Sequence, residues 1–147
     1  MKTQGGFLVS QIKQLQGRTF ERMLRDSGVD AFNGAQGRIL YVLWEREKLT
    51  ISEIGRLTSL AKTTLTSMLD RMEAGGLVER VPDTRNRRQI HVILTPKARE
   101  CRKAYDAVSE RMNTLFYQGF DEKEIALFEA MLGRIIRNLE SENESES

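Results

Sequence analysis

The sequence predicts a mainly α-helical protein that carries one small β-hairpin. Most of its 147 residues fall into stretches whose apolar side chains recur every three or four positions, the spacing of one helix face. Residues 77–81 and 89–95 instead alternate apolar and polar side chains, and a polar loop joins them. These two observations favour helices arranged around a short antiparallel hairpin.

The first two predicted helices are separated by a turn. Apolar residues recur through residues 7–24 at steps of three to five, as on one face of an amphipathic helix. The segment DSGVDAFNG then interrupts the pattern with turn-forming residues. Asn33 and Gln36 have the spacing of a reciprocal capping box, so a second helix is expected from residue 34 onward.

Two short helices follow, close together in the chain. Ser52 is placed to cap the first of them. The buried stripe of the second has helical spacing and consists of Leu65, Met68, Leu69 and Met72. Gly75 and Gly76 end this helix, as glycines do where a helix end turns left-handed.

The hairpin and two further helices complete the chain. Pro96 ends the second strand and suits the first turn of a helix expected from residue 97 to about 117. Asp121 and Glu124 have capping-box spacing at the start of a final helix, whose apolar residues recur as far as Leu139. The acidic residues 142–147 have the composition of a disordered tail.

The order of elements, a helix–turn–helix followed directly by a hairpin, predicts a winged helix–turn–helix. Net charge is +2, but the segment from Lys62 to Lys103 holds ten Lys or Arg against five Asp or Glu, a basic excess suited to a polyanion. No apolar run approaches the roughly 18 residues of a membrane span. The chain start lacks a signal peptide, and Cys101 is the single cysteine. We therefore expect a cytoplasmic protein without a membrane partner.

The second helix of a helix–turn–helix enters the DNA major groove. Outside the buried stripe, its polar and basic side chains are candidate DNA contacts, namely Lys62, Thr63, Thr64, Thr66, Ser67 and Arg71. Hydroxyl and guanidinium groups bind phosphates and base edges. Asp70 would repel phosphates, so we expect it to pair with an arginine. Taken alone, the polar face of this helix is equally consistent with a solvated surface that binds nothing.

The hairpin loop carries three arginines, Arg85, Arg87 and Arg88, in the run VPDTRNRRQIHVILT. A turn gains nothing from this cluster, whose mutual repulsion is unfavourable unless an anion relieves it. The minor groove over A·T tracts is such an anion and attracts arginine. The three arginines are therefore candidate minor-groove contacts. The alternative is a solvated charge run that Asp83 and Glu79 balance.

The stretch TISEIGRLTSLAKTTLTSMLDRMEAGGLVERVPDTRNRRQIHVILTPKA resembles the winged-helix core of the MarR family of bacterial transcriptional regulators. The markers are Thr64, Leu65 and Thr66 in the recognition helix, LDRMEAGGLVER before the first wing strand, and an arginine-rich wing that closes on Leu94 and Thr95. The helices on either side fit that family's dimerisation elements. The resemblance spans nearly the whole chain and depends on the order and spacing of these motifs.

The resemblance implies a homodimer that binds a pseudo-palindromic operator in double-stranded DNA. Residues 1–30 and 97–141 would form the dimerisation region, and residues 31–96 the DNA-binding region. The residues expected at the dimer interface are Leu8, Ile12, Leu15, Phe128, Leu132, Ile135 and Ile136. The recognition helices would enter successive major grooves. Arg88, with Arg87 beside it, matches the wing-tip arginine that enters the flanking minor groove in this family.

Two residues depart from the family's pattern. Asn86 stands where an aspartate often braces the wing arginine, so Asp83 or Glu79 is expected to take this role. Ala61 stands where a serine usually caps the recognition helix, and its side chain accepts no hydrogen bond. Ser59 is the nearby candidate to compensate.

Other residues allow a further interpretation. In this family, the second and fifth helices border a cleft for aromatic or phenolic effectors, and the residues of this sequence placed there are Tyr41, Trp44, Tyr105, Met112 and Phe116. Ordinary packing is the alternative. Cys101 lies among basic residues that lower a thiol pKa, but redox sensors of the family typically carry their cysteine in the first helix. His91, the single histidine, lacks further ligands, so no metal or other cofactor is expected.

The favoured function is therefore a dimeric, sequence-specific DNA-binding transcriptional regulator that acts as a repressor. Its release by a small aromatic ligand is implied by the family resemblance alone. An enzyme is not expected, because the sequence shows no paired catalytic carboxylates, no Ser/His/Asp or Cys/His set and no phosphate-binding glycine loop. Two alternatives remain open. One is a winged-helix module that binds a protein, and the other is an architectural protein that binds DNA without sequence preference.

Overall fold

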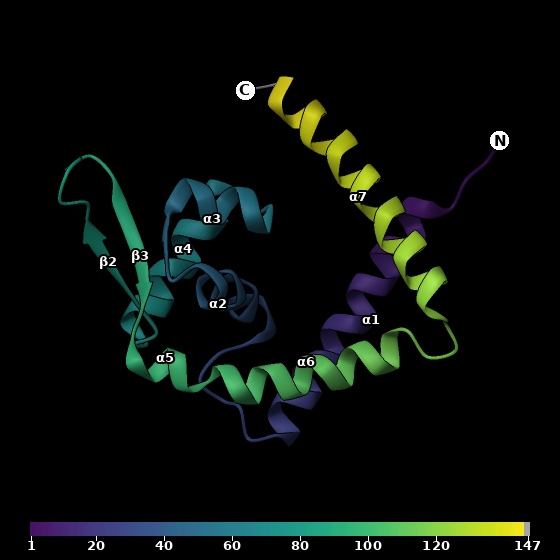
Figure 1. Ribbon diagram of the computed structural model, residues 1–147, viewed down its shortest axis with the longest axis horizontal. Coiled ribbons are helices and arrows are strands. Elements are labelled where there is room, and N and C mark those ends of the chain that lie inside the picture. Colours follow the sequence, from purple (N-terminus) through teal and green to yellow (C-terminus); the bar gives the residue numbers. More distant parts are fainter. Residues whose placement is uncertain (146–147) are drawn as a thin grey trace. The chain divides into compact units, whose positions relative to one another are not determined.

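The computed structural model describes residues 1–145 and forms two compact units, Met1–Glu110 and Arg111–Ser147 (Figure 1). The helices are α1 (Gly5–Asp26), α2 (Gly34–Arg46), α3 (Ile51–Thr58), α4 (Lys62–Ala74), α5 (Pro96–Glu100), α6 (Arg102–Phe116) and α7 (Glu122–Ser145). The strands are β1 (Lys48–Thr50), β2 (Val78–Pro82) and β3 (Ile90–Leu94). The mainly α-helical class with a small antiparallel wing is confirmed. Within residues 1–145, no helix is both long and apolar enough to cross a membrane.

The predicted capping box at the start of α2 is present. The Asn33 side chain accepts a hydrogen bond from the Gln36 amide at 2.8 Å, and the Gln36 side chain accepts one from the Asn33 amide at 3.2 Å. The Glu21 carboxylate of α1 also accepts a bond from the Gly34 amide. These bonds satisfy amides that no helical carbonyl reaches. The last of them ties α1 to the start of α2.

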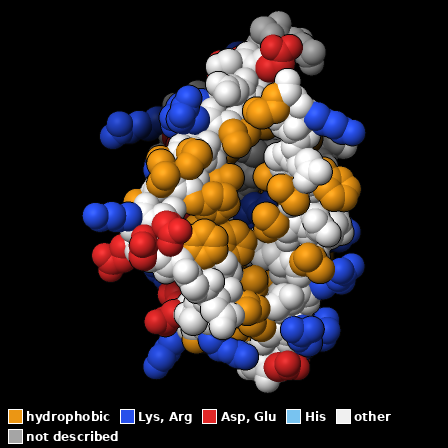
Figure 2. Space-filling model, turned by 90° about the vertical axis from the view of Figure 1, so that its right-hand side faces the viewer, with side chains coloured by type: hydrophobic (Ala, Val, Ile, Leu, Met, Phe, Trp, Pro, Cys, Tyr) orange, Lys and Arg blue, Asp and Glu red, His pale blue; other side chains and the backbone are white. Residues whose placement is uncertain are grey.

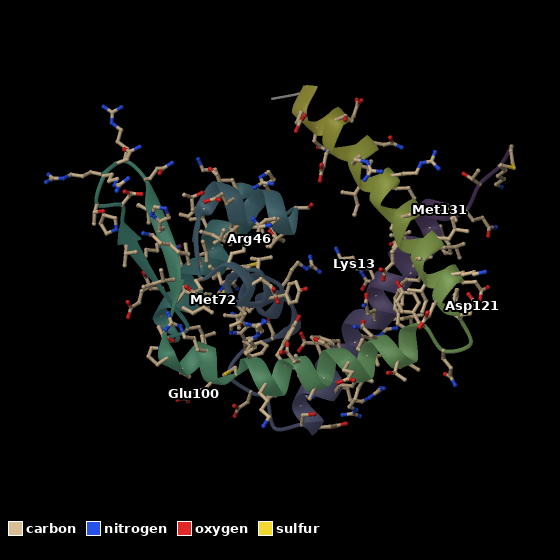
Figure 3. The ribbon with its side chains drawn as sticks, in the orientation of Figure 1. Lys13, Arg46, Met72, Glu100, Asp121 and Met131 are labelled. Carbon is tan, nitrogen blue, oxygen red and sulfur yellow. The ribbon has the colours of Figure 1, made fainter. Side chains whose placement is uncertain are left out.

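The hydrophobic core of the first unit lies between its helices and the sheet. Ile39, Leu40 and Leu43 of α2 are fully buried in it. The predicted stripe of α4 is also confirmed, because all four of its members, Leu65, Met68, Leu69 and Met72, are buried. Met72 is labelled in Figure 3. Burial of one such side chain contributes about 1.5–3 kcal/mol, so this stripe determines which face of α4 stays exposed.

β3 is the central strand of a three-stranded antiparallel sheet with the order β1-β3-β2. In its register, His91 lies opposite Thr50 of β1 and Val81 of β2. Beyond the last paired residues, the Asp83 amide donates to the Gln89 carbonyl at 3.0 Å. This bond closes the hairpin at the base of the wing loop, which is the projecting tip at the left of Figure 1.

The start of α3 differs from the expectation. Thr50, not Ser52, caps the helix: its hydroxyl accepts from the Glu53 amide at 3.2 Å, and the Glu53 carboxylate accepts from the Thr50 amide at 3.0 Å. The sequence pattern also omits β1, whose three residues are too few for a recognisable alternation. Because β1 holds Thr50 in an extended conformation, the helix begins directly after it.

The helix expected at residues 97–117 is divided into α5 and α6. Pro96 occupies the first turn of α5, as predicted. At Cys101 the backbone amide donates to the Ala98 carbonyl at 3.2 Å, three residues back rather than four, which tightens the chain for one turn. The Trp44 indole of α2 donates to the same Ala98 carbonyl at 3.0 Å, so this acceptor is shared where the helix is interrupted.

The second unit contains the end of α6, a short turn and α7. Gly119 in the turn has φ +86°, a left-handed conformation that favours glycine. The predicted capping box of α7 is present, with Asp121 accepting from the Glu124 amide at 2.8 Å and Glu124 accepting from the Asp121 amide at 3.0 Å. An aromatic cluster packs around the turn and consists of Phe116, Tyr117, Phe120 and Phe128.

α7 extends further than the sequence predicts. Disorder is expected over residues 142–147, whereas the helix continues to Ser145. Glutamate is a good helix former, and adding a residue to an existing helix is far easier than starting one. The Asn143 side chain also donates to the Leu139 carbonyl at 2.8 Å. Residues 146–147 of the expected tail lie outside the described residues.

Candidate nucleic-acid interface

The turn of the helix–turn–helix is built by the residues that end α3. Thr58 is buried; its hydroxyl donates to the Ile54 carbonyl at 2.6 Å and accepts from the Leu60 amide at 3.4 Å. Ser59 takes the left-handed conformation, with φ 59° and ψ 22°, and reverses the chain. The idea that Ser59 caps α4 is therefore wrong. The N-cap of α4 is Ala61, without a side-chain hydrogen bond.

The side chains predicted to contact DNA from α4 are all exposed, namely Lys62, Thr63, Thr64, Thr66, Ser67 and Arg71. Two of them bond one turn back: the Thr66 hydroxyl donates to the Lys62 carbonyl at 2.9 Å, and Arg71 donates to the Ser67 hydroxyl at 3.3 Å. The first amides of α4 have no side-chain cap, so the positive end of the helix dipole is open. This face suits contact with phosphates and base edges.

Asp70 of α4 pairs with an arginine, as predicted. Its Oδ1 lies 2.8 Å from Nη2 of Arg80 on β2. Arg80 also donates to the Thr66 carbonyl at 3.4 Å and lies 3.9 Å from the Glu73 carboxylate. The acidic side chains of α4 are thus partly neutralised from the wing.

The wing loop between β2 and β3 is held by hydrogen bonds to its backbone. Asp83 Oδ1 accepts from the amides of Arg85 at 2.7 Å and Asn86 at 3.1 Å, and Asn86 Oδ1 accepts from the Arg88 amide at 3.2 Å. These three bonds are termed the wing clasp. The two amide bonds to Asp83 favour its charged form and lower the pKa of that carboxyl, and His91 adds a smaller attraction.

The wing arginines themselves remain exposed, and these are Arg85, Arg87 and Arg88. Within residues 1–145, none of their guanidinium groups forms an ion pair. Side chains with nitrogen ends extend outward from the hairpin tip in Figure 3. Of the two expected braces, Asp83 acts on the loop backbone, whereas Glu79 takes no part in the clasp. The arginine charges are therefore available to an external anion.

His91 on β3 lies beside the second carboxylate oxygen of Asp83. Its Nδ1 lies 3.5 Å from Asp83 Oδ2, and its side chain is 13% exposed. Among the described residues, no group of three or more His, Cys, Asp or Glu side chains is placed to hold a metal ion. His91 is thus a packing partner of the wing clasp.

The residues predicted to border an effector cleft have different environments. Trp44 is buried, and the Tyr105 ring packs on it with a centroid distance of 5.0 Å. Burial raises the pKa of Tyr105. Tyr41 is exposed on α2, and Met112, in the second unit, is buried. Trp44 and Tyr105 form part of the packed core of the first unit, and the cleft stays a prediction.

Cys101 lies at the junction of α5 and α6, and its Sγ donates to the Lys97 carbonyl at 3.4 Å. Burial raises the pKa of its thiol, although the Lys97 charge opposes this. The expectation that nearby basic residues lower this pKa is therefore wrong in its net direction. Because the thiolate is the reactive form of cysteine, this environment favours a structural role.

The predicted dimerisation residues lie on α1 and α7. Those with 40–52% of their surface exposed in the single chain are Leu8, Ile12, Leu15, Ile135 and Ile136. Phe128 and Leu132 are partly buried. Figure 2 shows hydrophobic side chains exposed among charged ones on the face that it presents. Exposed apolar stripes of this kind commonly mark an interface, and dimerisation stays a prediction.

Arg80 and the Thr50–Glu53 capping box are contributors to the site that sequence reasoning missed. Arg80 is a basic residue within a wing strand, and Asp70 and Glu73 are acidic residues on the helix before it. These opposite charges were the available signal that the helix and the strand attract each other. The pairing of Arg80 with Asp70 and Glu73 follows only from the packing of α4 against β2.

The chain resembles several described regulators. The MarR family pattern matches residues 32–90. The chain is 36% identical over 89 residues to the HTH-type transcriptional regulator TtmR of Methylorubrum extorquens, covering 60% of this chain and 46% of TtmR. It is 34% identical over 95 residues to the uncharacterised HTH-type regulator YsmB of Bacillus subtilis, covering 63% of this chain and 64% of YsmB. The chain thus spans about half to two thirds of the length of these curated relatives.

The fold also resembles a solved structure over most of the chain. A mutant of MarR from Escherichia coli, crystallised with operator DNA, superposes with a TM-score of 0.78 at 26% identity, covering 88% of this chain and 91% of that chain. The helix–turn–helix and its basic wing thus form a winged-helix domain of the kind found in these regulators. Residues 32–90 match the MarR family of winged-helix transcriptional regulators, and the fold agrees with a member of that family over 88% of the chain.

Proposed function

We propose that this protein binds double-stranded operator DNA as a homodimer, with α4 in the major groove and the wing in the adjacent minor groove. The observation that carries the proposal is the wing itself: a loop fixed by the clasp presents three exposed guanidinium groups that form no ion pair with any residue of the described part, 1–145. Like charges repel, and an anion between them relieves that repulsion. The similar MarR structure with operator DNA supports the same interpretation.

The two parts of the site have different roles in this proposal. The hydroxyl and guanidinium groups of Ser67 and Arg71 on α4 read base edges. The wing arginines respond to the width and potential of the minor groove instead. Ser67→Ala therefore alters preference within the half-sites. Arg88→Ala weakens binding and relaxes the preference for A·T-rich flanks.

The number of basic contacts sets the expected salt dependence. Each protomer contributes five candidate basic side chains, which are Lys62, Arg71, Arg85, Arg87 and Arg88. If every one neutralises a phosphate in a dimer, the slope of log affinity against log salt reaches about −9. Arg88→Ala removes two of these charges from the dimer and reduces the magnitude of the slope by about 2.

The test begins with selection of bound fragments from random DNA by the wild-type protein. Fluorescence anisotropy against salt then compares wild type, Arg88→Ala and the matched control Arg99→Ala, an exposed arginine on α5. We expect a palindromic site, a preference of roughly 10³ or more over random DNA, and loss of affinity in Arg88→Ala alone. A flat salt slope excludes DNA as the partner. Equal affinity for random DNA excludes sequence-specific regulation.

The dimer rests on the exposed apolar stripes of α1 and α7. On α7, Leu132, Ile135 and Ile136 lie on one face, whereas Ala130 lies on the opposite face at about 100° per residue. The double variant Ile135→Glu, Ile136→Glu places two charges in the proposed interface. It is expected to be a monomer in sedimentation equilibrium, or to be insoluble on expression. Ala130→Glu leaves the assembly unchanged. A soluble dimer with both isoleucine replacements contradicts the proposed interface.

We further propose that the dimer represses transcription and that a small aromatic or phenolic ligand releases it. The match of residues 32–90 to the MarR family, and the likeness to MarR of Escherichia coli, support both statements. In this proposal the ligand binds more tightly to a dimer whose two recognition helices are held at a separation different from the one that the operator needs. It then lowers operator affinity by the difference between its affinities for the two states. Transcription in vitro from a promoter that overlaps the selected operator tests repression, and a rise in transcript contradicts it. Titration of aromatic acids and phenols into the complex tests release, which is rejected if anisotropy does not fall.

A further inference from the structure

Arg80 connects the wing to the recognition helix by several contacts. It lies on β2, opposite Val92 of the central strand β3. Its Nη2 is 2.8 Å from Asp70 Oδ1 and 3.4 Å from the Thr66 carbonyl oxygen, and its Nη1 is 3.9 Å from Glu73 Oε1. Its backbone amide donates to the other Glu73 oxygen at 3.1 Å. One residue of the wing thus contacts α4 at three positions.

These three positions follow one line along α4. Thr66, Asp70 and Glu73 are four and three residues apart, so they lie above one another on the same helix face. The buried stripe presses α4 onto the core, but apolar contacts are not directional. Charge-assisted hydrogen bonds are short and directional. Contacts along this line therefore restrict rotation and sliding of α4 against β2.

Arginine suits this position better than lysine. A guanidinium group is planar and offers five N–H donors in a fixed fork, whereas an ammonium is a compact point charge. The Arg80 side chain is 23% exposed, against 60% for Asp70, so it is turned toward α4 rather than toward solvent. Its Nε is buried and has no hydrogen-bond partner among the residues that the structure describes. The side-chain contacts to α4 therefore run through the two terminal nitrogens.

We propose that Arg80 is a positioning residue for operator recognition, which fixes α4 relative to the wing without itself contacting DNA. This inference rests on the proposed function, because it concerns how α4 contacts bases in the major groove while the wing contacts the adjacent minor groove. Arg80 then determines the preference for operator over random DNA. The exposed basic residues determine the overall affinity for DNA.

Asp70→Asn gives a sharp test, because simple charge leaves the operator-to-random ratio unchanged, whereas positioning lowers it. The change removes a negative charge beside DNA, so charge alone strengthens binding to every sequence. It also weakens the hold of Arg80 on α4, so positioning lowers the preference for operator. Arg80→Lys keeps the net charge but replaces the planar fork, whose two terminal nitrogens face different acceptors, with a single ammonium nitrogen. That variant retains affinity for random DNA and loses operator preference.

The experiment measures affinity for the selected operator and for a random duplex of equal length by fluorescence anisotropy. Wild type is compared with Asp70→Asn, with Arg80→Lys and with Arg99→Lys, the same substitution at an exposed position of α5. A loss of register is expected to resemble one mismatched base pair and to lower the operator-to-random ratio about tenfold. Arg99→Lys retains the wild-type ratio. In the free proteins, amides of α4 exchange hydrogen faster in both test variants.

The proposal is overturned if Arg80→Lys and Asp70→Asn retain the wild-type ratio. It is also overturned if Arg80→Lys loses equal affinity for both duplexes, since that result reports altered charge or folding rather than register. A wild-type protein without operator preference overturns the proposed function instead. Hydrogen exchange in the free variants then still decides whether Arg80 holds α4, and unchanged rates reject that role.

Discussion

Removal of one acceptor from the wing clasp should weaken operator binding without changing any charge. Asn86 Oδ1 accepts a hydrogen bond from the Arg88 amide at 3.2 Å. Asn86→Ala deletes this acceptor and leaves the loop held by Asp83 and by the backbone bond from the Gln89 amide to the Asn86 carbonyl at 3.0 Å. The loop can then place Arg88 in more conformations, and binding must select the productive one.

The size of this effect follows from the exposure of the bond. A hydrogen bond contributes about 0.5–1.5 kcal/mol net, and an exposed one lies at the lower end because water replaces the acceptor. About 0.5–1 kcal/mol in each wing gives about 1–2 kcal/mol in a dimer that uses both wings, or roughly a 5- to 30-fold loss of operator affinity. Global stability should change little, since Asn86 is exposed.

The assay is fluorescence anisotropy with the selected operator over a range of salt. Asn86→Ala should weaken binding at every salt concentration and leave the slope of log affinity against log salt unchanged, because the number of released counterions is the same. Asn113→Ala, the same change at an exposed position of α6, is the matched control. Affinity within twofold of wild type refutes the reasoning. So does a slope reduced as much as in Arg88→Ala.

Two further predictions concern stability. A Cβ at Gly37 would lie 2.7 Å from Cε2 of Tyr105, whose ring is packed among other aromatic rings. Gly37→Ala should therefore lower stability by about 1–3 kcal/mol through overpacking. This loss exceeds the roughly 1 kcal/mol that alanine gains over glycine in helix propensity. Thermal denaturation should show a lower midpoint for Gly37→Ala than for the wild type. Gly55→Ala is the control and should show a higher midpoint, because its new Cβ meets nothing closer than 3.7 Å. Equal shifts in the two variants would reject the packing of Gly37 against Tyr105. Burial and the 2.6 Å hydrogen bond from its hydroxyl to Glu129 raise the pKa of Tyr117 to about 12. Since this folded pKa lies above the ordinary value of 10, the stabilisation is complete below pH 10 and is lost as pH rises toward 12. Urea unfolding of wild type and Tyr117→Phe should therefore converge across that window, and a constant difference would contradict the assignment.

Features that depend on neighbouring residues could be predicted from the sequence. Asn33 and Gln36 are three residues apart, as are Asp121 and Glu124, so both halves of each capping box occur in one short stretch. The exposed face of α4 follows from helix geometry once its apolar stripe is known. Chain-local geometry alone determines these features, and each was confirmed.

Features that depend on residues distant in the chain could not be predicted in this way. The cap of α3 falls on Thr50 rather than Ser52 because β1 pairs with β3, some forty residues further along. The pKa of Cys101 is raised by burial, which packing determines, although its neighbours in sequence are basic. The partner of Asp70 was expected to be an arginine, but the choice of Arg80 required the position of β2 beside α4.

The neutral residue at Asn86 changes how the wing is braced rather than removing the brace. An aspartate there would offer the same acceptor but would add a negative charge among three arginines, and a carboxylate that pairs with a guanidinium competes with DNA for it. Asn86 supplies the acceptor without that charge. Asp83 is then the single carboxylate of the loop, with Oδ1 engaged by two amides and Oδ2 facing His91. The backbone is therefore held while the arginine charges form no ion pair within residues 1–145, and entry into a narrow, negative groove needs both properties together.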